Sequence, residues 1–201
     1  MISRLSVFIT EVLQNSGVIE KKDNELYVYG FFVFLSQGMF FLLTVLFGLV
    51  IGTLWESVLF YILFSFLRCF AGGFHAKKES LCTFCTTVAL FLAVLCISFL
   101  KQDGSNAISI CMLVFGSSIV FLLSPLESED KPLSSEEKRE YRKKSLEAVF
   151  AIVVIALSGW LIDIPGLRYA SAISLTLEGV LLISGKVNSS DKHSVVKKSA
   201  F

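Results

Sequence analysis

The chain has 201 residues and a formal net charge of only +1, and hydrophobic residues make up 54% of it. Charged residues make up 17%, against roughly 25% in a soluble domain, which leaves too few charges to cover the surface of a soluble fold. The 19 Phe and three Pro exclude a disordered chain, and the lack of a basic excess argues against a nucleic-acid binder. The composition therefore predicts a membrane protein with several spans.

The first 26 residues contain no apolar run long enough for the core of a secretory signal peptide. Apolar side chains instead recur at helical spacing from Ile2 to Leu13, and Glu11 and Gln14 lie among them. We therefore expect residues 1–26 to form a cytosolic amphipathic segment, whose helix lies on the inner face of the membrane. Packing of this helix on the rest of the protein is the alternative.

Apolar stretches predict six membrane helices, because a helix needs about 20 mostly apolar residues to cross a bilayer. The predicted spans are residues 28–50, 54–70, 80–100, 104–126, 148–162 and 167–185. Turns are expected at residues 48–53 and 163–166, where the apolar pattern contains Gly or Pro. Ahead of the fifth span, Ser134 and Glu137 have the spacing of a capping box, which predicts a short helix leading into that span.

The predicted fold is therefore all-α: a polytopic membrane protein with about six transmembrane helices and an N-terminal amphipathic helix, in one domain over residues 1–201. Four spans with two half-inserted segments are the alternative. All but two of the 18 Lys and Arg residues, Lys101 and Arg168, fall on one side of the six spans. Because cytosolic loops carry the excess of positive charge, we expect both termini, the tail at residues 186–201 and the second loop to be cytosolic.

The second loop and its flanks hold the candidate for chemistry. Residues 68–76 read Arg-Cys-Phe-Ala-Gly-Gly-Phe-His-Ala and lead to Cys82 and Cys85. An imidazole near a thiol can generate the thiolate that attacks a carbonyl. On a straight helix, His75 and Cys82 would lie about 10 Å apart along the axis, beyond hydrogen-bond reach. We therefore expect His75 on a loop or helix end and Cys82 in the first turns of the third span, where the helix dipole stabilises a thiolate.

The spacing of these residues alone does not single out a peptidase. An ordinary cytosolic loop with a glycine turn and a solvated His75 accounts for the same residues. The Cys82-x-x-Cys85 pattern also permits a membrane thiol oxidoreductase, although the reducing cytosol disfavours disulfide generation. A non-catalytic peptide transporter or export component could use Glu178, an acid inside a span, but no nucleotide-binding P-loop occurs. One nearby His makes a poor zinc site, so we expect no metal and no cofactor.

The pattern of Arg68, Gly72, Gly73, His75, Ala76 and Cys82 resembles the signature of the accessory gene regulator B (AgrB) family of bacterial membrane cysteine endopeptidases. Ser124-Pro125 and Lys131-Pro132-Leu133 also resemble the family's pattern after the fourth span. The length, the spans and the basic central loop agree, so the resemblance covers nearly the whole chain. It implies a peptidase in the bacterial cell membrane, with His75 and Cys82 as catalytic residues. Between Cys82 and Cys85 as nucleophile, only the resemblance decides.

The resemblance further implies a substrate, the AgrD-like precursor of a cyclic autoinducing peptide used in quorum sensing. Cys82 would attack the peptide bond at the C-terminal side of the future signal and release the rest of the precursor. The acyl-enzyme thioester would then pass to a precursor Cys or Ser, which closes a thiolactone or lactone ring without ATP. A homodimer is also implied.

Four further features could each have a functional or a structural role. Arg68 matches the family's Arg, and it could bind a substrate carboxylate, stabilise an oxyanion, or simply anchor the loop. Gly72 and Gly73 are expected to shape a turn. Lys131 and the basic residues 142–144 could attract an acidic precursor tail, although we favour an anchoring role. Glu178 could orient His75 or pair with Arg68.

Overall fold

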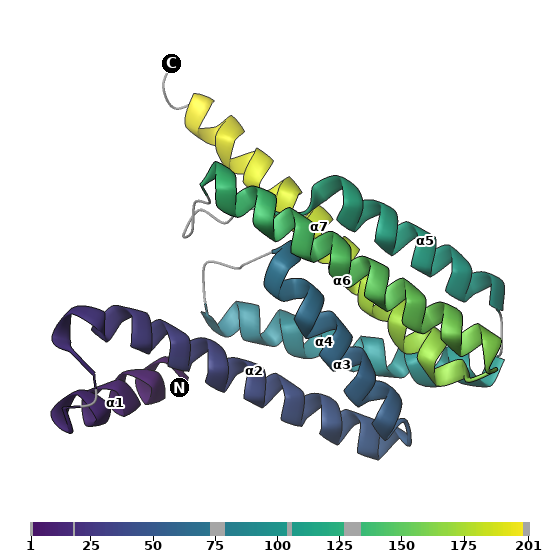
Figure 1. Ribbon diagram of the computed structural model, residues 1–201, viewed down its shortest axis with the longest axis horizontal. Helices are drawn as coiled ribbons and strands as arrows, with labels where there is room; N and C mark the ends of the chain where they lie inside the picture. The colour runs from purple at the N-terminus through teal and green to yellow at the C-terminus, as the bar shows by residue number, and fades with distance from the viewer. Residues whose placement is uncertain (1, 18, 73–78, 104–105, 127–133, 199–201) are drawn as a thin grey trace. The chain divides into compact units, whose positions relative to one another are not determined.

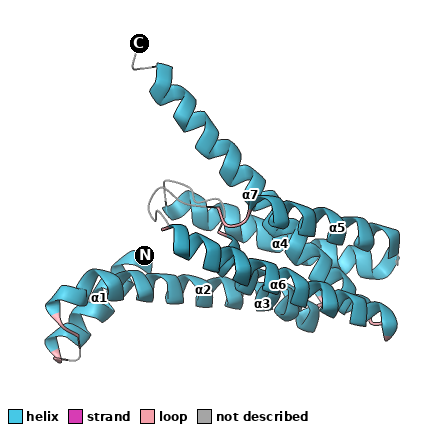
Figure 2. Ribbon diagram, turned by 45° about the horizontal axis from the view of Figure 1, so that its top comes forward, coloured by secondary structure: helices cyan, strands magenta, loops and turns pink. Residues whose placement is uncertain are grey.

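The computed structural model describes residues 2–17, 19–72, 79–103, 106–126 and 134–198 (Figure 1). Within these residues the chain forms helices and no strand, as the colours of Figure 2 show. The elements are α1 (Ile2–Asn15), η1 (Lys21–Asp23, a short 3-10 helix), α2 (Asn24–Ile51), α3 (Leu54–Ala71), α4 (Glu79–Asp103), α5 (Asn106–Leu123), α6 (Ser135–Leu161) and α7 (Pro165–Lys198). The predicted all-α fold class is confirmed.

The chain divides into two compact units, Met1–Leu46 and Phe47–Phe201, and the boundary between them falls inside α2. The first unit holds α1, η1 and most of α2. The second holds the last turn of α2 and helices α3 to α7. A single membrane domain over residues 1–201 stays a prediction.

The predicted amphipathic helix is present in the first unit as α1. Its buried side chains are the small polar Ser6 and Thr10, whose hydroxyls donate to backbone carbonyl oxygens one turn earlier, each at 2.9 Å. These bonds within the helix satisfy hydroxyls that would otherwise be buried without a partner. The apolar Leu5, Phe8 and Val12 are exposed instead. An uncovered apolar face is what a helix lying on a membrane surface requires.

Both predicted turns are present in the second unit. After α2, Gly52 has a φ of 80°, a left-handed conformation that favours glycine. Before α7, Asp163 has a φ of 52°, and the helix begins at Pro165, whose fixed φ suits the first helical position. Gly166 then lets α7 approach α3 closely, because an added Cβ would collide with the ring of Trp55.

The polar stretch before the fifth span belongs to one long helix. At its start, Ser134 Oγ accepts from the backbone N–H of Glu137 at 3.3 Å, and Glu137 Oε2 accepts from the backbone N–H of Ser134 at 2.9 Å. The predicted capping box is therefore confirmed. The short helix predicted to lead into the fifth span is the start of that span's own helix, because α6 runs without a break from the cap to Leu161. No Gly or Pro lies between the cap and the apolar segment to end a helix there.

Six of the described helices, α2 to α7, are long and apolar enough to cross a membrane. They coincide with the six predicted spans, apart from the longer polar starts and ends. Large apolar side chains such as Phe99, Leu122 and Phe150 are exposed on them, as contact with lipid requires. The chain is therefore a multi-pass membrane protein, and its helices fit the six-span architecture rather than the four-span alternative.

Helix α7 is the centre of the second unit and packs against α3, α4, α5 and α6 (Figure 1). In its membrane segment 56% of the residues are buried, against 22% in that of α5. Close packing depends on small residues, as is usual between membrane helices. An added Cβ at Gly116 of α5 would lie 2.5 Å from the carbonyl carbon of Leu175 on α7. The Thr176 hydroxyl also lies 3.0 Å from the carbonyl oxygen of Met112, within hydrogen-bond distance.

The two cations that the charge pattern assigned to the poorly charged side are both neutralised. Lys101, near the end of α4, forms an ion pair with Glu56 in the first turn of α3. Arg168, near the start of α7, lies 3.2 Å from the carboxylate of Asp163 and donates to Asn106 Oδ1 at 3.0 Å. These partners account for two cations at that end of the bundle.

Candidate active site

The described part of the chain includes most of the candidate residues from the sequence: Arg68, Gly72, Cys82, Cys85, Glu178 and the basic residues 142–144. His75, Gly73 and Lys131 lie outside the described residues, so their predicted places and roles stay predictions. The description of the site therefore covers the Cys82 thiol and the Arg68 guanidinium, and the His75 imidazole lies outside it.

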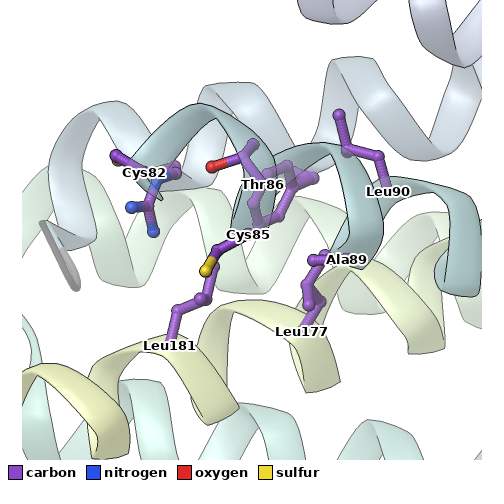
Figure 3. A pocket seen from close by; sticks show the side chains of 9 residues that line it. Cys82, Cys85, Thr86, Ala89, Leu90, Leu177 and Leu181 are labelled. Carbon is purple, nitrogen blue, oxygen red and sulfur yellow. The ribbon is translucent and has the colours of Figure 1, made fainter. Parts of the chain in front are cut away.

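A small cavity of about 40 Å³ lies where α3, α4 and α7 meet (Figure 3). Its wall is mostly apolar, and Arg68 is the charged residue in it. The lining residues are Phe64 and Arg68 of α3, Cys82, Cys85, Thr86, Ala89 and Leu90 of α4, and Leu177 and Leu181 of α7. The fold thus brings Arg68 and Cys82, which lie on different helices, to the same cavity.

Cys82 is the fourth residue of α4, so it lies in the first turns of the third span, where the sequence predicts it. A thiolate there is stabilised by the positive end of the helix dipole. The Cys82 side chain is half-buried, and Cys85 one turn further on is exposed. Figure 3 shows the Cys85 sulfur directed toward Leu181 on α7. Both cysteines line the cavity, so position alone does not choose between them.

None of the five cysteines forms a disulfide. Among the described residues, no group of three or more His, Cys, Asp or Glu side chains is placed to hold a metal ion.

Arg68 and Glu178 form an ion pair across the interface of α3 and α7. Arg68 Nη1 donates to Glu178 Oε2 at 3.5 Å, and the Arg68 guanidinium also lies over the ring of Phe64, 5.9 Å from its centre. The Glu178 side chain is 0% exposed, and that of Arg68 is 20% exposed. The Arg68 guanidinium can thus compensate the charge of a carboxylate buried in a membrane helix. Of the two roles considered for Glu178, the pairing with Arg68 is therefore present.

Gly72 turns the chain at the end of α3 and holds it against the segment after α5. Its φ is 79°, and an added Cβ would collide with the carbonyl oxygen of Leu126. Beside it, the Leu126 N–H donates to the carbonyl oxygen of Ala71 at 2.9 Å. Leu126 follows the Ser124-Pro125 peptide bond, which is cis. Two stretches that resemble the family's pattern, around Gly72 and at Ser124-Pro125, thus meet in space.

Arg142 has a structural role that sequence reasoning did not find. Its guanidinium donates to the carbonyl oxygens of Ser124 at 2.9 Å and Phe121 at 3.2 Å. These carbonyls are at the end of α5, where no further turn of helix supplies donors. The Ser124 hydroxyl lies 2.5 Å from that of Ser145, which adds a second link between α5 and α6. The signal in the sequence was an Arg on the helix that follows an uncapped helix end.

The two neighbouring lysines pair with acids on their own helix. Lys144 Nζ lies 2.6 Å from Glu140 Oε1, and Lys143 Nζ lies 3.9 Å from Glu147 Oε1. Both are pairs of residues four apart, which stabilise a helix weakly at its solvated surface. Lys143 and Lys144 thus stay at the surface of α6, with side chains 79% and 47% exposed, and the anchoring role of residues 142–144 stays a prediction.

Comparisons with known proteins agree on one family. The sequence model of accessory gene regulator B matches residues 6–183. The putative AgrB-like protein 2 of Clostridium perfringens is 27% identical over 183 residues, which cover 82% of this chain and 84% of that protein. A putative AgrB-like protein of Listeria monocytogenes is 30% identical over 166 residues, or 80% of this chain and 76% of that protein.

Protein FsrB of Enterococcus faecalis is 30% identical over 129 residues, which cover 60% of this chain and 50% of that protein. No solved structure matches the chain. Because the family model spans α1 through most of α7, including the described part of the site, this membrane protein belongs to the accessory gene regulator B family.

Proposed function

We propose that this protein is a cysteine endopeptidase that removes the C-terminal part of an autoinducing-peptide precursor in quorum sensing. Cys82 is the nucleophile and His75 the general base. The observation that carries the proposal is the shared cavity, in which a thiol at the start of α4 lies in the same wall as the guanidinium of Arg68. Membership of the accessory gene regulator B family supports the same activity.

The reaction proceeds in two acyl transfers. His75 takes the proton of the Cys82 thiol, and the thiolate sulfur bonds to the carbonyl carbon of the scissile peptide. The C–N bond then breaks, the leaving amine takes the proton from His75, and an acyl-enzyme thioester remains. A Cys thiol or Ser hydroxyl of the same precursor attacks this thioester, closes the ring and returns the proton to Cys82. No ATP is needed, because the acyl group stays activated throughout.

The cavity suits these steps in its size and its polarity. At about 40 Å³ it has room for a carbonyl group, but not for a folded peptide. We therefore infer that the precursor presents an extended segment to it. The apolar side chains from α4 and α7 keep bulk water from the thioester, whose hydrolysis would end the reaction before the ring closes. We assign Arg68, which lies in the same wall, to donate to the oxyanion that forms on the attacked carbonyl.

The charge pattern supports a site near the cytosolic face. With both termini and the second loop in the cytosol, the end of α3 and the start of α4, which hold Arg68 and Cys82, lie toward the side where an AgrD-like precursor is synthesised. The same side keeps the Cys82 thiol reduced. A homodimer remains an expectation of the resemblance.

The test is cleavage of a synthetic precursor by the full-length protein in proteoliposomes. Cys82→Ala and Cys82→Ser should each abolish cleavage, and His75→Ala should do the same, because each removes a group that forms or breaks a bond. Cys85→Ala should still cleave. Wild-type protein should also accumulate an adduct at Cys82 with the mass of the N-terminal precursor fragment. Cleavage by Cys82→Ala, or loss of cleavage in Cys85→Ala alone, would show that the assigned nucleophile is wrong.

A further inference from the structure

We infer that Glu178 is a positioning residue for this reaction: its carboxylate holds the Arg68 guanidinium in the wall of the Cys82 cavity, directed at the scissile carbonyl oxygen of a neutral peptide bond. The inference rests on the proposed function. It assigns Arg68 to the carbonyl rather than to a substrate carboxylate, and it gives the buried acid of α7 a role in the chemistry.

The burial of the two side chains indicates that Glu178 fixes the position of Arg68, and not the reverse. Glu178 lies on α7, the helix that packs against four others, and its side chain is 0% exposed. Arg68 lies in the last turn of α3 and is 20% exposed, so its long side chain would have several rotamers without a partner. Leu177 and Leu181, on either side of Glu178 in the chain, line the cavity itself. The rigid helix therefore fixes the position of the guanidinium at the cavity wall.

The guanidinium can serve two groups at once. It carries five N–H donors in a planar fork, so one edge can bond Glu178 while another part of the group faces the cavity. The Glu178 contact uses Nη1, with 3.5 Å between the two atoms. The Phe64 ring beneath the guanidinium adds a second constraint on its plane. Fixed donors of this kind lower a barrier because they need not reorganise as charge develops.

The charge of the ion pair determines whether the Arg68 guanidinium binds a carboxylate oxygen or the scissile carbonyl oxygen of the substrate. The Arg68–Glu178 pair is neutral overall, so the attraction of Arg68 for a substrate carboxylate in the cavity is offset in part by repulsion from the more distant Glu178. Attack by a thiolate on a neutral carbonyl moves one negative charge from sulfur to oxygen and adds none. The Arg68–Glu178 pair can stabilise this movement of charge, because the oriented guanidinium of Arg68 donates hydrogen bonds to the carbonyl oxygen. The precursor residue at the scissile bond therefore needs no side-chain carboxylate in order to bind Arg68.

The opposite end of α3 supplies a matched control. Glu56 is also a buried carboxylate in an ion pair with a cation of another helix, and its side chain is 1% exposed. Neither Glu56 nor Lys101 lines the cavity. Glu56→Gln therefore reports what the loss of a buried ion pair does to the protein in general, without a change at the site.

The experiment compares Glu178→Gln, Glu178→Asp and Glu56→Gln in proteoliposomes. Each is given the precursor and an otherwise identical precursor with a thioamide at the scissile bond, whose sulfur is a weaker hydrogen-bond acceptor. We expect Glu178→Gln to lower kcat by about 10- to 100-fold with little change in KM, since removal of one oxyanion donor costs about 10²–10³. Glu178→Asp should recover part of this loss, and Glu56→Gln should retain wild-type kcat among molecules that fold.

The amide-to-thioamide rate ratio separates positioning from mere folding. It should fall several-fold in Glu178→Gln and stay unchanged in Glu56→Gln, because only the former weakens the contact with the carbonyl oxygen. An unchanged ratio or kcat in both Glu178 variants would overturn the inference. If Glu178→Gln does not fold, the amide-to-thioamide rate ratio of Glu178→Asp tests the inference in its place. Absence of cleavage by wild-type protein, or cleavage by Cys82→Ala, would instead overturn the proposed function itself.

Discussion

Helix α3 carries a buried ion pair at each end, and the two pairs differ in what surrounds them. At its start, Glu56 pairs with Lys101, whose side chain is 39% exposed. At its end, Arg68 pairs with Glu178 beside a cavity that contains a thiol. Arg68 is twelve positions after Glu56, which places the two pairs about 18 Å apart along the helix. The pair at the start of α3 lies away from that cavity, and on our proposal the pair at the end of α3 also takes part in the chemistry.

The largest effect is expected from Arg68→Gln, which leaves the Glu178 carboxylate buried without its cation. Loss of one partner of a buried pair costs roughly 3–5 kcal/mol. Thermal unfolding in detergent should therefore show a marked loss of stability, and the precursor should not be cleaved. The double variant Arg68→Gln with Glu178→Gln should recover most of the stability but none of the cleavage. Recovery of cleavage in the double variant would show that the pair is only structural.

The next largest effect is expected from Lys101→Gln at the other end. It should also destabilise the protein, because it leaves Glu56 buried, but by less than Arg68→Gln, since Lys101 is more exposed. Molecules that fold should cleave the precursor at the wild-type rate. A loss of kcat in Lys101→Gln as large as that in Arg68→Gln would show that the two ion pairs of α3 do not differ in their effect on cleavage.

Gly72→Ala tests how the site end of α3 is held. It forces a side chain into a left-handed backbone and against the Leu126 carbonyl oxygen, so we expect a loss of about 1–3 kcal/mol and reduced cleavage. Gly52→Ala is the matched control, because Gly52 has a φ of 80° with no atom within 4 Å of an added Cβ. The difference between their unfolding temperatures measures the contact with Leu126. Equal temperatures would mean that this contact contributes nothing.

The smallest effect is expected from Lys143→Gln, on the solvated surface of α6. Its side chain is 79% exposed and its distance from Glu147 is 3.9 Å, so unfolding should not change measurably. The KM for a precursor with an acidic tail should also stay within about twofold of wild type, because a single screened surface charge contributes little. A large rise in KM that high salt abolishes would restore the hypothesis that this basic cluster attracts the tail.

Much of the site could be placed from the sequence, but not the contacts within it. The charge-free runs around residues 28–70 and the Gly52 turn predicted where α2 and α3 lie, and the boundary between span and loop placed Cys82 near the start of α4. The position of Gly72 as a turn was also predicted. The partner of that turn, Leu126, could not be predicted, since it lies in a different loop and has no pattern of its own.

The polar helix predicted ahead of the fifth span and the span itself belong to one helix, α6. The sequence placed the span at residues 148–162, where hydropathy is high. Hydropathy reports contact with lipid, however, and the helical hydrogen bonds of α6 continue through polar residues wherever no Gly or Pro stops them. The charged start of α6 is therefore a solvated extension of a membrane helix.

Composition and charge were sufficient to predict a helical membrane protein and its six spans, because backbone polar groups in a bilayer must be satisfied within each helix. Those are local properties, and they can be read along the chain. The pairing of Arg68 with Glu178, 110 residues apart, depended on how α3 and α7 pack, as did the meeting of Arg68 and Cys82 at one cavity. Packing between helices is set by small residues such as Gly116 and Gly166, whose partners a one-dimensional pattern does not contain.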